Sequence, residues 1–418
     1  MLDIKFIRGN LSQVKEAVRK KRVVLDLDRL LEVDDKRRGL IKKIDDFRHQ
    51  QNVASEEIAK SKDSKKIEEM KALKQDLVKL ESELRLIEEE FKNILLQVPQ
   101  VPDESVPEGK SDQDNKPVKF WGEPTKFDFE AKDHIVLMKE LDLVDFERGA
   151  KVAGFRGYFL KNEALLLCTA LWQFTLDQMI KKGFTPIFAP SLVREDSFLG
   201  TGWLPQGKDE VYKTQDDLYL AGTAEVPVMG MHQDEILTEE ELPKKYIAFS
   251  PCFRREAGSY GKDTKGIYRL HEFMKMEQVV LCRNDKIESR SWHEEITKNA
   301  EELLQALKLP YRVVVNCAGD LGLGQVKKYD IETWIPSQQK YGETHSSSYF
   351  YDFQTRRLNI QYRTKEGKVE FVHSLNNTAL ATPRILINIL ENYQQKDGSV
   401  KVPEVLQKYL GGLEIIKR

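Results

Sequence analysis

Apolar residues recur every three or four positions through two long stretches of the first hundred residues. The first stretch covers 26–60, and the second is a cleaner heptad pattern that stops at Val98-Pro99. Such spacing places apolar side chains along one face of a helix, so we expect two long helices and a shorter one beginning near Asn10. The seam residues are Leu27, Leu30, Leu40, Ile41, Ile44, Phe47, Val53 and Ile58, then Met70, Leu73, Leu77, Leu80, Leu84, Ile87, Phe91 and Ile94.

Only a short polar break, Ser61-Lys62-Asp63-Ser64, separates the two long helices. Helices joined in this way fold back as an antiparallel pair, and ~33 residues at about 1.5 Å each project roughly 50 Å. A pair this long with one narrow apolar seam is an arm rather than a globular core. Its use stays open between a dimerising coiled coil and a surface for nucleic-acid phosphates. The basic side chains are Lys60, Lys62, Lys65 and Lys66 at the tip, and Arg37, Arg38, Lys42 and Lys43 along the shaft.

The pattern changes after the arm, which spans residues 1–100. Residues 101–126 are rich in Pro, Gly and charge, which predicts a linker, and 127–418 mixes helical and strand periods. Helices are expected at 130–140, 162–182, 286–308 and 384–395. Strands are expected near 186–189, 217–220, 246–256, 267–282, 311–315, 329–334, 347–354 and 370–373. Several strands follow one another directly, which favours an α+β fold with a mainly antiparallel sheet over a doubly wound one.

Composition narrows the class only slightly. The 418 residues are 40% hydrophobic and 32% charged, with a net charge of -2, so no global basic field indicates a nucleic-acid binder. The four cysteines form no CxxC pair and no zinc spacing. We expect them to be reduced thiols in a cytoplasmic protein. The chain opens quickly into charge, and the longest apolar run, near 164–172, is too short to span a bilayer.

The most informative stretch for chemistry is FRREAGSYGKDTKGIYRLHEF at 253–273, between the strands expected at 246–256 and 267–281. Side chains of a strand alternate between faces. Arg254 and Glu256 therefore share a face opposite Arg255, and the odd-numbered residues of the second strand share another: Arg269, His271, Phe273, Lys275 and Glu277. Arginines, carboxylates and an aromatic ring on one surface suit a nucleotide. A salt-bridged hairpin on a solvated sheet explains the pattern about equally well.

These segments and others resemble the seryl-tRNA synthetase family of class II aminoacyl-tRNA synthetases over essentially the whole chain. GFTPIFAP at 183–190 is similar to motif 1, 253–273 to motif 2, and LNNTALATPRILINILENYQ at 375–394 to motif 3. GTGWLP at 200–205, AGTAEVP at 221–227, AGDLGLGQVKKYDIETW at 318–334 and GETHSSSYFYDFQTRR at 342–357 are similar to signatures of seryl enzymes. The helical arm in front is also a family feature.

The resemblance implies a function and partners. L-serine would react with ATP to give seryl-adenylate, and the 3′ end of tRNA(Ser) would then take the seryl group; charging of tRNA(Sec) stays open. The family fold implies a class II catalytic domain over 127–418, a tRNA-binding arm over 1–100, and a homodimer with Pro190 at its interface. The polar loop 257–266 would approach the tRNA acceptor end.

The resemblance also implies roles for single residues. Arg254, Arg384 and Glu343 would be catalytic. The ATP site would comprise Arg254, Arg255, Glu256, Phe273, Glu343, Thr344, His345, Ser346 and Arg384, with Phe273 stacked on adenine and Arg384 on the γ-phosphate. Mg²⁺ would be held by Glu343 and Ser346. The serine site would comprise Thr223, Ala224, Glu225, Glu277, Asn376 and Thr378.

Some positions depart from the family pattern. His345 and Tyr349 stand where a small residue or serine and an asparagine are common, and Asn377, Ala379 and Pro383 stand where motif 3 usually has glycines. Two other functions are weighed against the synthetase. An amino acid:carrier-protein ligase on the same catalytic domain would lack the arm. A non-catalytic paralogue would have lost Arg254, Glu256 or Arg384, and all three are present.

Overall fold

The computed structural model describes residues 1–61, 64–259 and 263–418, and for 57–61, 64–67 and 259 it describes the backbone alone. The chain divides into two compact units, Met1–Pro99 and Gln100–Arg418. We call them the N-terminal and the C-terminal unit and describe each by itself. Among the described residues, no helix has both the length and the apolar character needed to cross a membrane.

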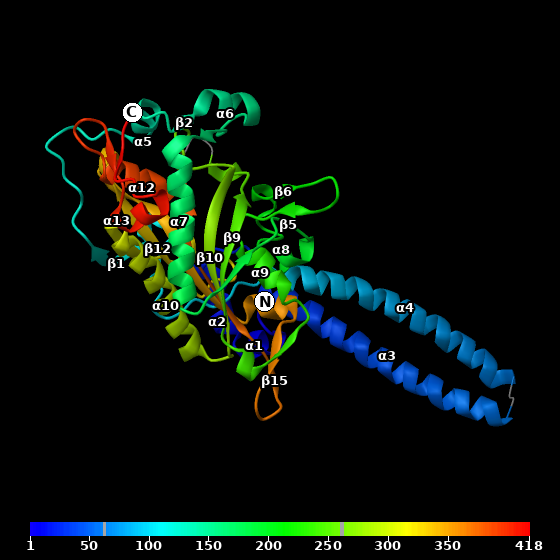
Figure 1. Cartoon of the computed structure of the whole chain (residues 1–418). Coiled ribbons are helices and arrows are strands. Elements are labelled where there is room, and N and C mark those ends of the chain that lie inside the picture. The colour runs from blue at the N-terminus through cyan, green and yellow to red at the C-terminus, as the bar shows by residue number, and fades with distance from the viewer. Residues whose placement is uncertain (62–63, 260–262) are drawn as a thin grey trace. The chain divides into compact units, whose positions relative to one another are not determined.

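The N-terminal unit is built from helices, two of them long and side by side (Figure 1). The helices are α1 (Ile4–Gly9), α2 (Leu11–Lys20), α3 (Leu27–Ser61) and α4 (Ser64–Leu95). Leu30, Leu40, Ile44 and Leu77 are buried along the seam between α3 and α4. The long pair was predicted from the heptads, whereas α1 was not, because six residues are too few to show a helical period.

Ion pairs join the two long helices across the seam. Arg29 lies 2.6 Å from Glu90, and Arg48 lies 2.8 Å from Glu81. The seam is therefore closed within one chain, and most of the outer faces stay polar. Along the shaft Arg38, Lys42 and Lys43 are exposed, while Arg37 pairs with Asp34 and lies over the ring of Phe91. The predicted lysine cluster at the tip, Lys60, Lys62, Lys65 and Lys66, lies outside the described side chains.

The C-terminal unit is organised by an eight-stranded sheet in which all neighbours are antiparallel except β4 and β9. Its order is β1 (Lys116–Trp121), β11 (Tyr311–Val315), β12 (Lys327–Ile335), β13 (Lys340–Tyr351), β16 (His373–Thr382), β10 (Glu272–Cys282), β9 (Lys244–Phe253) and β4 (Thr185–Phe188). This sheet confirms the predicted α+β class. Figure 1 shows β9 and β10 as the long hairpin expected around residue 260.

Helices pack against the sheet and share one apolar core with it. They are α5 (His134–Glu140), α7 (Asn162–Lys181), α10 (Lys286–Ala306) and α12 (Arg384–Asn392). In β10 the even-numbered Met276 and Val280 enter this core, and the Gln278 amide donates to the Ile296 carbonyl of α10 at 3.0 Å. Alternation then leaves the odd-numbered side chains on the opposite face, where the cavity described below lies.

Four strand predictions need correction. The strand expected at 347–354 is β13, which begins at Lys340 and ends at Tyr351. β1 falls within 101–126, where a linker was expected; it is an edge strand whose register shifts after Pro117, a position where proline is tolerated. The strand expected at 370–373 includes only the first residue of β16, because the following stretch LNNTALAT is polar and small. Burial between β13 and β10 nevertheless makes β16 a central strand. β10 begins at Glu272 rather than 267, since Ile267 and Leu270 are buried in a loop.

Short elements complete the unit. They are β2 (Val144–Asp145), α6 (Phe146–Ala153), β3 (Phe159–Leu160), β5 (Leu192–Val193), α8 (Glu195–Thr201), β6 (Tyr212–Lys213), β7 (Tyr219–Leu220), α9 (Glu225–Met231), β8 (Ile236–Thr238), α11 (Phe353–Leu358), β14 (Gln361–Arg363), β15 (Val369–Phe371), β17 (Val400–Lys401), α13 (Glu404–Gln407) and β18 (Ile415–Ile416). Of these, α9 and α11 carry residues of the cavity and its support.

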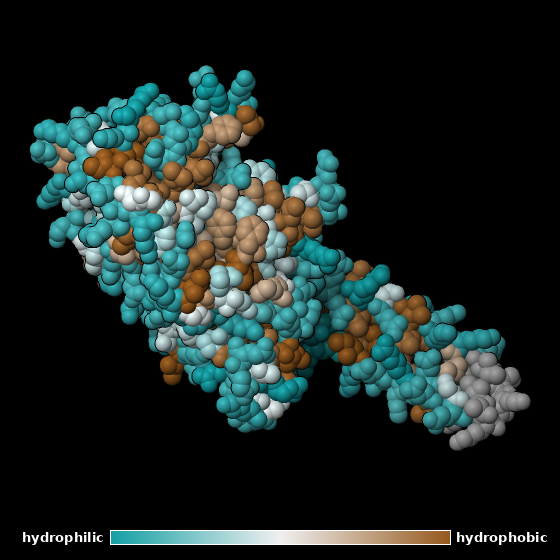
Figure 2. All heavy atoms as spheres, in the orientation of Figure 1, coloured by the Kyte–Doolittle hydropathy of each residue, from teal (hydrophilic) through white to brown (hydrophobic). Residues whose placement is uncertain are grey.

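An apolar patch is exposed on the C-terminal unit where α7 meets β4 and β9. Figure 2 shows apolar residues gathered near the middle of this unit in that view. The patch lines a shallow groove formed by Trp172, Leu176, Ile187, Phe188 and Phe249. Phe188 is the most exposed of these side chains, at 71%.

Candidate active site

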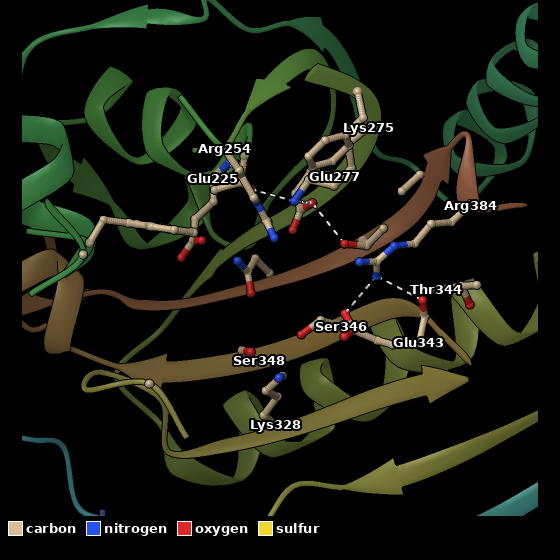
Figure 3. Close-up of a pocket in the computed structure, with 18 of the residues that line it drawn as sticks. Glu225, Arg254, Lys275, Glu277, Lys328, Glu343, Thr344, Ser346, Ser348 and Arg384 are labelled. Carbon is tan, nitrogen blue, oxygen red and sulfur yellow. Dashed lines mark hydrogen bonds and ion pairs between the residues drawn. The ribbon is translucent and has the colours of Figure 1, made fainter. Parts of the chain in front are cut away.

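A cavity of about 550 Å³ opens on the face of the sheet formed by β10, β13 and β16 (Figure 3). Clefts of this size that combine apolar walls with a few convergent polar groups are the usual ligand sites of proteins. The structure brings twelve of the predicted site residues together around it. They are Thr223, Glu225, Arg254, Glu256, Phe273, Glu277, Glu343, Thr344, Ser346, Asn376, Thr378 and Arg384.

Three predicted site residues do not line the cavity with their side chains. Ala224 is fully buried before α9. Arg255 is exposed, and its backbone N–H donates to the Glu210 carbonyl at 3.0 Å. His345 is buried on the far side of β13, where its Nδ1 lies 2.8 Å from Thr344 Oγ1. Burial lowers the pKa of His345 to about 4, so this imidazole is neutral at pH 7.

Two β-bulges explain why residues of both parities reach the cavity. Between β12 and β13 the register passes from Ile331 opposite His345 to Glu332 opposite Glu343, which leaves Thr344 as the extra residue. Glu343 and Ser346 therefore face the same side, although strict alternation would separate them. Between β10 and β16 the extra residue is Ala379. Simple alternation in the sequence predicts neither bulge.

Arg254 is held at the end of β9 by contacts on several sides. Its Nε donates to the Gly222 carbonyl at 3.3 Å. Its guanidinium carbon lies 5.4 Å from the ring centroid of Phe273 and 5.8 Å from that of Trp203. A Cβ at Gly222 would approach the Arg254 side chain to 3.3 Å, so glycine leaves room for this arginine. A fixed fork with free N–H groups suits phosphate or carboxylate.

Arg384 begins α12 and is fixed by Tyr268 and Glu343. Its Nε donates to the Tyr268 carbonyl at 3.1 Å and its Nη1 to the Glu343 carbonyl at 3.0 Å. The guanidinium lies 4.6 Å from the Tyr268 ring centroid, and the Glu343 carboxylate lies 3.4 Å from Nη1. The Tyr268 hydroxyl in turn donates to the Glu343 carbonyl at 2.9 Å. The arginine is thus oriented before any ligand enters.

Glu256 follows β9 with a strained backbone. Its φ is +55°, in the left-handed region that non-glycine residues rarely adopt. Its carboxylate accepts from Arg269 Nη1 at 2.8 Å, and Arg269 also lines the cavity. Strain of this kind often marks a binding site. His271 lies outside the cavity lining, and its ring nitrogen is 3.0 Å from the Arg254 carbonyl. Residues 260–262 of the adjoining loop lie outside the described part of the chain.

The deepest part of the cavity is a network of buried polar side chains. Glu277 is 2% exposed and forms an ion pair with Lys275. Thr378 Oγ1 donates to Glu277 at 3.4 Å, and Lys275 Nζ donates to Thr223 Oγ1 at 2.8 Å. Burial raises the pKa of Glu277 above its ordinary value, while Lys275 and Arg254 oppose that shift.

Glu225 opens α9 beside this network. Its carboxylate accepts from Gln354 Nε2 of α11 at 2.6 Å. Burial raises the pKa of Glu225 to about 7, and the nearby Glu277 adds to the shift. Buried carboxylates here favour the binding of a cation such as an amino group.

Several cavity residues were not predicted as site residues. The clearest is Lys328 of β12, whose Nζ lies 3.0 Å from Asp330. Burial lowers the pKa of Lys328, but Asp330 and Glu343 outweigh it, so the pKa stands above its ordinary value. Tyr268, Arg269, Lys275, Ser348 and Trp203 also line the cavity. Lys328 alternates with Asp330 in the sequence, and this pattern is the signal from which Lys328 could have been predicted as a site residue.

Of the departures from the family pattern, Pro383 lines the cavity next to Arg384, and the other four do not line it. Tyr349 is buried, and its hydroxyl donates to Asp103 at 2.8 Å; Arg290 pairs with the same carboxylate. This tyrosine therefore anchors the segment that enters the C-terminal unit. Asn377 and Ala379 are fully buried, so they fill space beneath β16 rather than contact a ligand.

Comparison with known proteins gives the same assignment along the whole chain. Residues 1–102 match the family described as the seryl-tRNA synthetase N-terminal domain, and residues 210–393 match the tRNA synthetase class II core domain (G, H, P, S and T). The serine–tRNA ligase of Deinococcus radiodurans is 46% identical, covering 100% of this chain and 99% of the relative. That of Caldicellulosiruptor saccharolyticus is also 46% identical, with 100% of both chains covered.

Solved structures agree with this assignment. The seryl-tRNA synthetase from Pyrococcus horikoshii complexed with ATP superposes with a TM-score of 0.92 at 41% identity, covering 100% of this chain and 99% of that one. The cytoplasmic serine–tRNA ligase of Naegleria fowleri in complex with AMP gives 0.89 at 34% identity, with the same coverage. A prolyl-tRNA synthetase of Giardia lamblia shares the fold alone, over 65% of this chain and 54% of that one, at 16% identity and a TM-score of 0.57. The chain belongs to the seryl-tRNA synthetase family.

Proposed function

We propose that the cavity of this serine–tRNA ligase binds ATP and L-serine together, forms seryl-adenylate, and presents it to the 3′ end of tRNA(Ser). One observation carries the proposal: a single cavity holds two fixed arginines, Arg254 and Arg384, together with the buried carboxylate Glu277. The arginines suit the phosphates of ATP, and the carboxylate suits the amino group of serine.

ATP would lie against the arginines and Phe273. Arg254 would hold the α-phosphate and the serine carboxylate, and Arg384 would hold the γ-phosphate. Phe273 lines the cavity beside Arg254, which leaves an aromatic face for adenine. Glu256, whose carboxylate also pairs with Arg269, would accept from the adenine amine. The presence of ATP and AMP in the two relatives' structures supports this part of the proposal.

Serine would occupy the buried network. Its amino group would pair with Glu277, and its hydroxyl would meet the side chains of Thr378 and Asn376, which line the same cavity. A site built to pair a hydroxyl rejects an analogue that lacks it, because alanine would leave buried polar groups unpaired. As a substrate, threonine would bring one more methyl group than serine into this network. The network residues Glu277, Thr378 and Thr223 are all less than a tenth exposed.

The chemistry then needs positioning and charge stabilisation rather than a protein nucleophile. A serine carboxylate oxygen attacks the α-phosphorus, and the bond to the β-phosphate oxygen breaks, releasing pyrophosphate. Arg254 neutralises the charge that builds on the α-phosphate oxygens. In the second step the terminal adenosine hydroxyl of the tRNA attacks the seryl carbonyl carbon and AMP leaves.

The residues present also fit Mg²⁺. Glu343 offers a carboxylate that is 47% exposed, and Ser346 lies on the same side of the bulge in β13. In the described part of the chain, no group of three or more Asp, Glu, His or Cys side chains could form a metal cage. One carboxylate, one hydroxyl and substrate phosphates are the ligand set that Mg²⁺ usually accepts. When bound, Mg²⁺ would neutralise phosphate charge.

The arm and the apolar patch support further parts of the proposal. The arm would hold tRNA(Ser) by shape and backbone contacts, since its exposed basic residues Arg38, Lys42 and Lys43 suit phosphates. The groove at Trp172 and Phe188 would be covered by a second copy of this chain in a homodimer. The four cysteines are all unpaired thiols, which suits the reducing cytoplasm.

The test is ATP–pyrophosphate exchange with serine, threonine, alanine and glycine as separate substrates. We expect exchange with serine to exceed that with each of the others by at least about 100-fold in kcat/KM, as expected for a site that pairs a hydroxyl. Preference for alanine or glycine would favour a carrier-protein ligase instead. No exchange with any amino acid would favour a non-catalytic RNA-binding paralogue.

A further inference from the structure

A buried lysine lies among the side chains proposed to bind serine. Lys275 is 5% exposed, in the middle of β10, and its side chain lines the cavity (Figure 3). It forms an ion pair with Glu277 on the same strand. Its Nζ donates at 2.8 Å to Oγ1 of Thr223, a residue just before α9. A lysine this buried is rare unless it is paired, and here both partners belong to the proposed serine site.

The hydrogen bonds of Thr223 have a fixed direction. A hydroxyl group has two lone pairs that accept and one hydrogen that donates. Thr223 Oγ1 accepts from Lys275 Nζ and also from the backbone N–H of Glu225 at 3.3 Å. Both of these partners are donors only, so the two lone pairs are used. The remaining O–H of Thr223 is left to donate to an oxygen acceptor in the cavity, which for serine is a carboxylate or hydroxyl oxygen.

The charge of Glu277 also depends on its neighbours from several elements. Lys275 of the same strand and Arg254 at the end of β9 favour the ionised form, and Thr378 of β16 donates to it. Burial and the carboxylate of Glu225 in α9 favour the protonated form. Only an ionised Glu277 accepts fully from an ammonium group, and Lys275 is the cation in direct contact with it.

We infer that Lys275 is a positioning residue of the serine site, which keeps Glu277 ionised and fixes the Thr223 hydroxyl as a donor toward the substrate. The inference rests on the proposed function, because it concerns the same site. A purely structural ion pair would stabilise β10 without affecting serine more than ATP. The positioning role instead affects serine selectively, since Lys275 contacts two proposed serine ligands and no proposed ATP ligand among the contacts described.

The test compares KM for serine and for ATP in pyrophosphate exchange by wild type, Lys275→Met and Lys245→Met. Methionine keeps much of the length and loses the charge. Lys245 is the matched control, because it lies on the neighbouring strand β9 and its Nζ donates to the Lys182 carbonyl, away from the cavity. For Lys275→Met we expect the serine KM to rise at least 30-fold, as loss of a buried charged partner gives roughly 10- to 100-fold, with the ATP KM within threefold. For Lys245→Met both constants should stay within threefold.

Two further measurements keep the inference testable. Lys275→Gln retains a donor for Thr223 without the charge, so its serine KM should rise less than that of Lys275→Met. If the methionine variant does not fold, the glutamine variant decides alone, by whether its serine KM rises more than its ATP KM. In Lys275→Ala, added propylammonium should restore serine-dependent exchange by at least tenfold. An unchanged serine KM, or serine and ATP constants that rise together, would overturn the inference. Absence of serine-dependent exchange in the wild type would instead overturn the proposed function.

Discussion

Arg384 Nη1 lies 3.0 Å from the carbonyl oxygen of Glu343 and 3.4 Å from its carboxylate. The strand β13 and the first residue of α12 are therefore joined at the cavity by one guanidinium. Tyr268 completes the arrangement, since the centroid of its ring lies 4.6 Å from the guanidinium carbon. An arginine held in this way keeps its remaining N–H groups aimed at the place where ATP would lie, and little reorganisation is needed when ATP binds.

Replacing Arg384 with lysine should show how much this orientation contributes. Lysine keeps the charge but loses the planar fork and the stacking on Tyr268. We expect kcat/KM for ATP in pyrophosphate exchange to fall by about 100- to 1000-fold, as is typical for removal of an oriented transition-state donor. The serine KM should change far less. Arg283→Lys, at an arginine paired with Glu288 away from the cavity, serves as the control, and an equal loss there would contradict the assignment.

Glu225 makes the stability of the C-terminal unit depend on pH. Its pKa of about 7 lies above the ordinary 4.5, so the folded state holds a proton that the unfolded state has lost between pH 4.5 and 7. The stabilisation is present below pH 4.5 and is lost as pH rises through 7. Glu225→Gln removes this dependence and retains an oxygen that accepts from Gln354.

We therefore compare the free energy of unfolding of Glu225→Gln with that of the wild type at each pH. The difference, variant minus wild type, should increase by about 2 kcal/mol between pH 5 and pH 8. Urea unfolding followed by tryptophan fluorescence measures it, because all five tryptophans lie in Gln100–Arg418. A difference that stays constant over this range would show that Glu225 is ionised throughout.

His345→Ser should leave adenylate formation within about tenfold of wild type. The bulge at Thr344 turns His345 away from the cavity, and the His345 side chain bonds to Thr344 without lining the cavity itself. Some loss of stability is expected, since a buried side chain is shortened. ATP–pyrophosphate exchange gives the result directly, and a thousandfold loss would mean that His345 takes part in the chemistry.

Deleting residues 30–95 should separate the two steps of the reaction. The C-terminal unit contains the whole cavity, so serine-dependent pyrophosphate exchange should persist within a few-fold. Charging of tRNA(Ser) should fall below detection, because the proposed tRNA contacts lie on the arm. Efficient charging by the truncated protein would make the arm an assembly device instead. Binding of tRNA by the full-length protein should also weaken steeply as the salt concentration rises.

The sequence predicts some parts of this molecule much better than others, for physical reasons. The arm follows from its heptads, and the shared face of Phe273, Lys275 and Glu277 follows from alternation in β10. The bulges at Thr344 and Ala379 do not, because an extra residue in a strand leaves no mark in a period of two. β16 was missed since its polar, small residues become a strand only through burial between two neighbours.

Lys275 shows the same limit within the site. Its place on the face of Phe273 and Glu277 was predicted, but its role depends on a 2.8 Å contact with Thr223, more than fifty residues earlier in the chain. Tyr349 is the opposite case. It looked like a change in the site, whereas its hydroxyl reaches Asp103 and its ring fills the core. Contacts between distant segments decide both roles.

The measurement that tests the central claim most directly is charging of tRNA by the full-length protein with radiolabelled serine and ATP. We predict that a tRNA(Ser) transcript accepts serine, that a tRNA(Thr) transcript does not, and that labelled threonine is not transferred to tRNA(Ser). Transfer of another amino acid in preference to serine, or no transfer to tRNA(Ser) by a protein that binds ATP, would contradict the account.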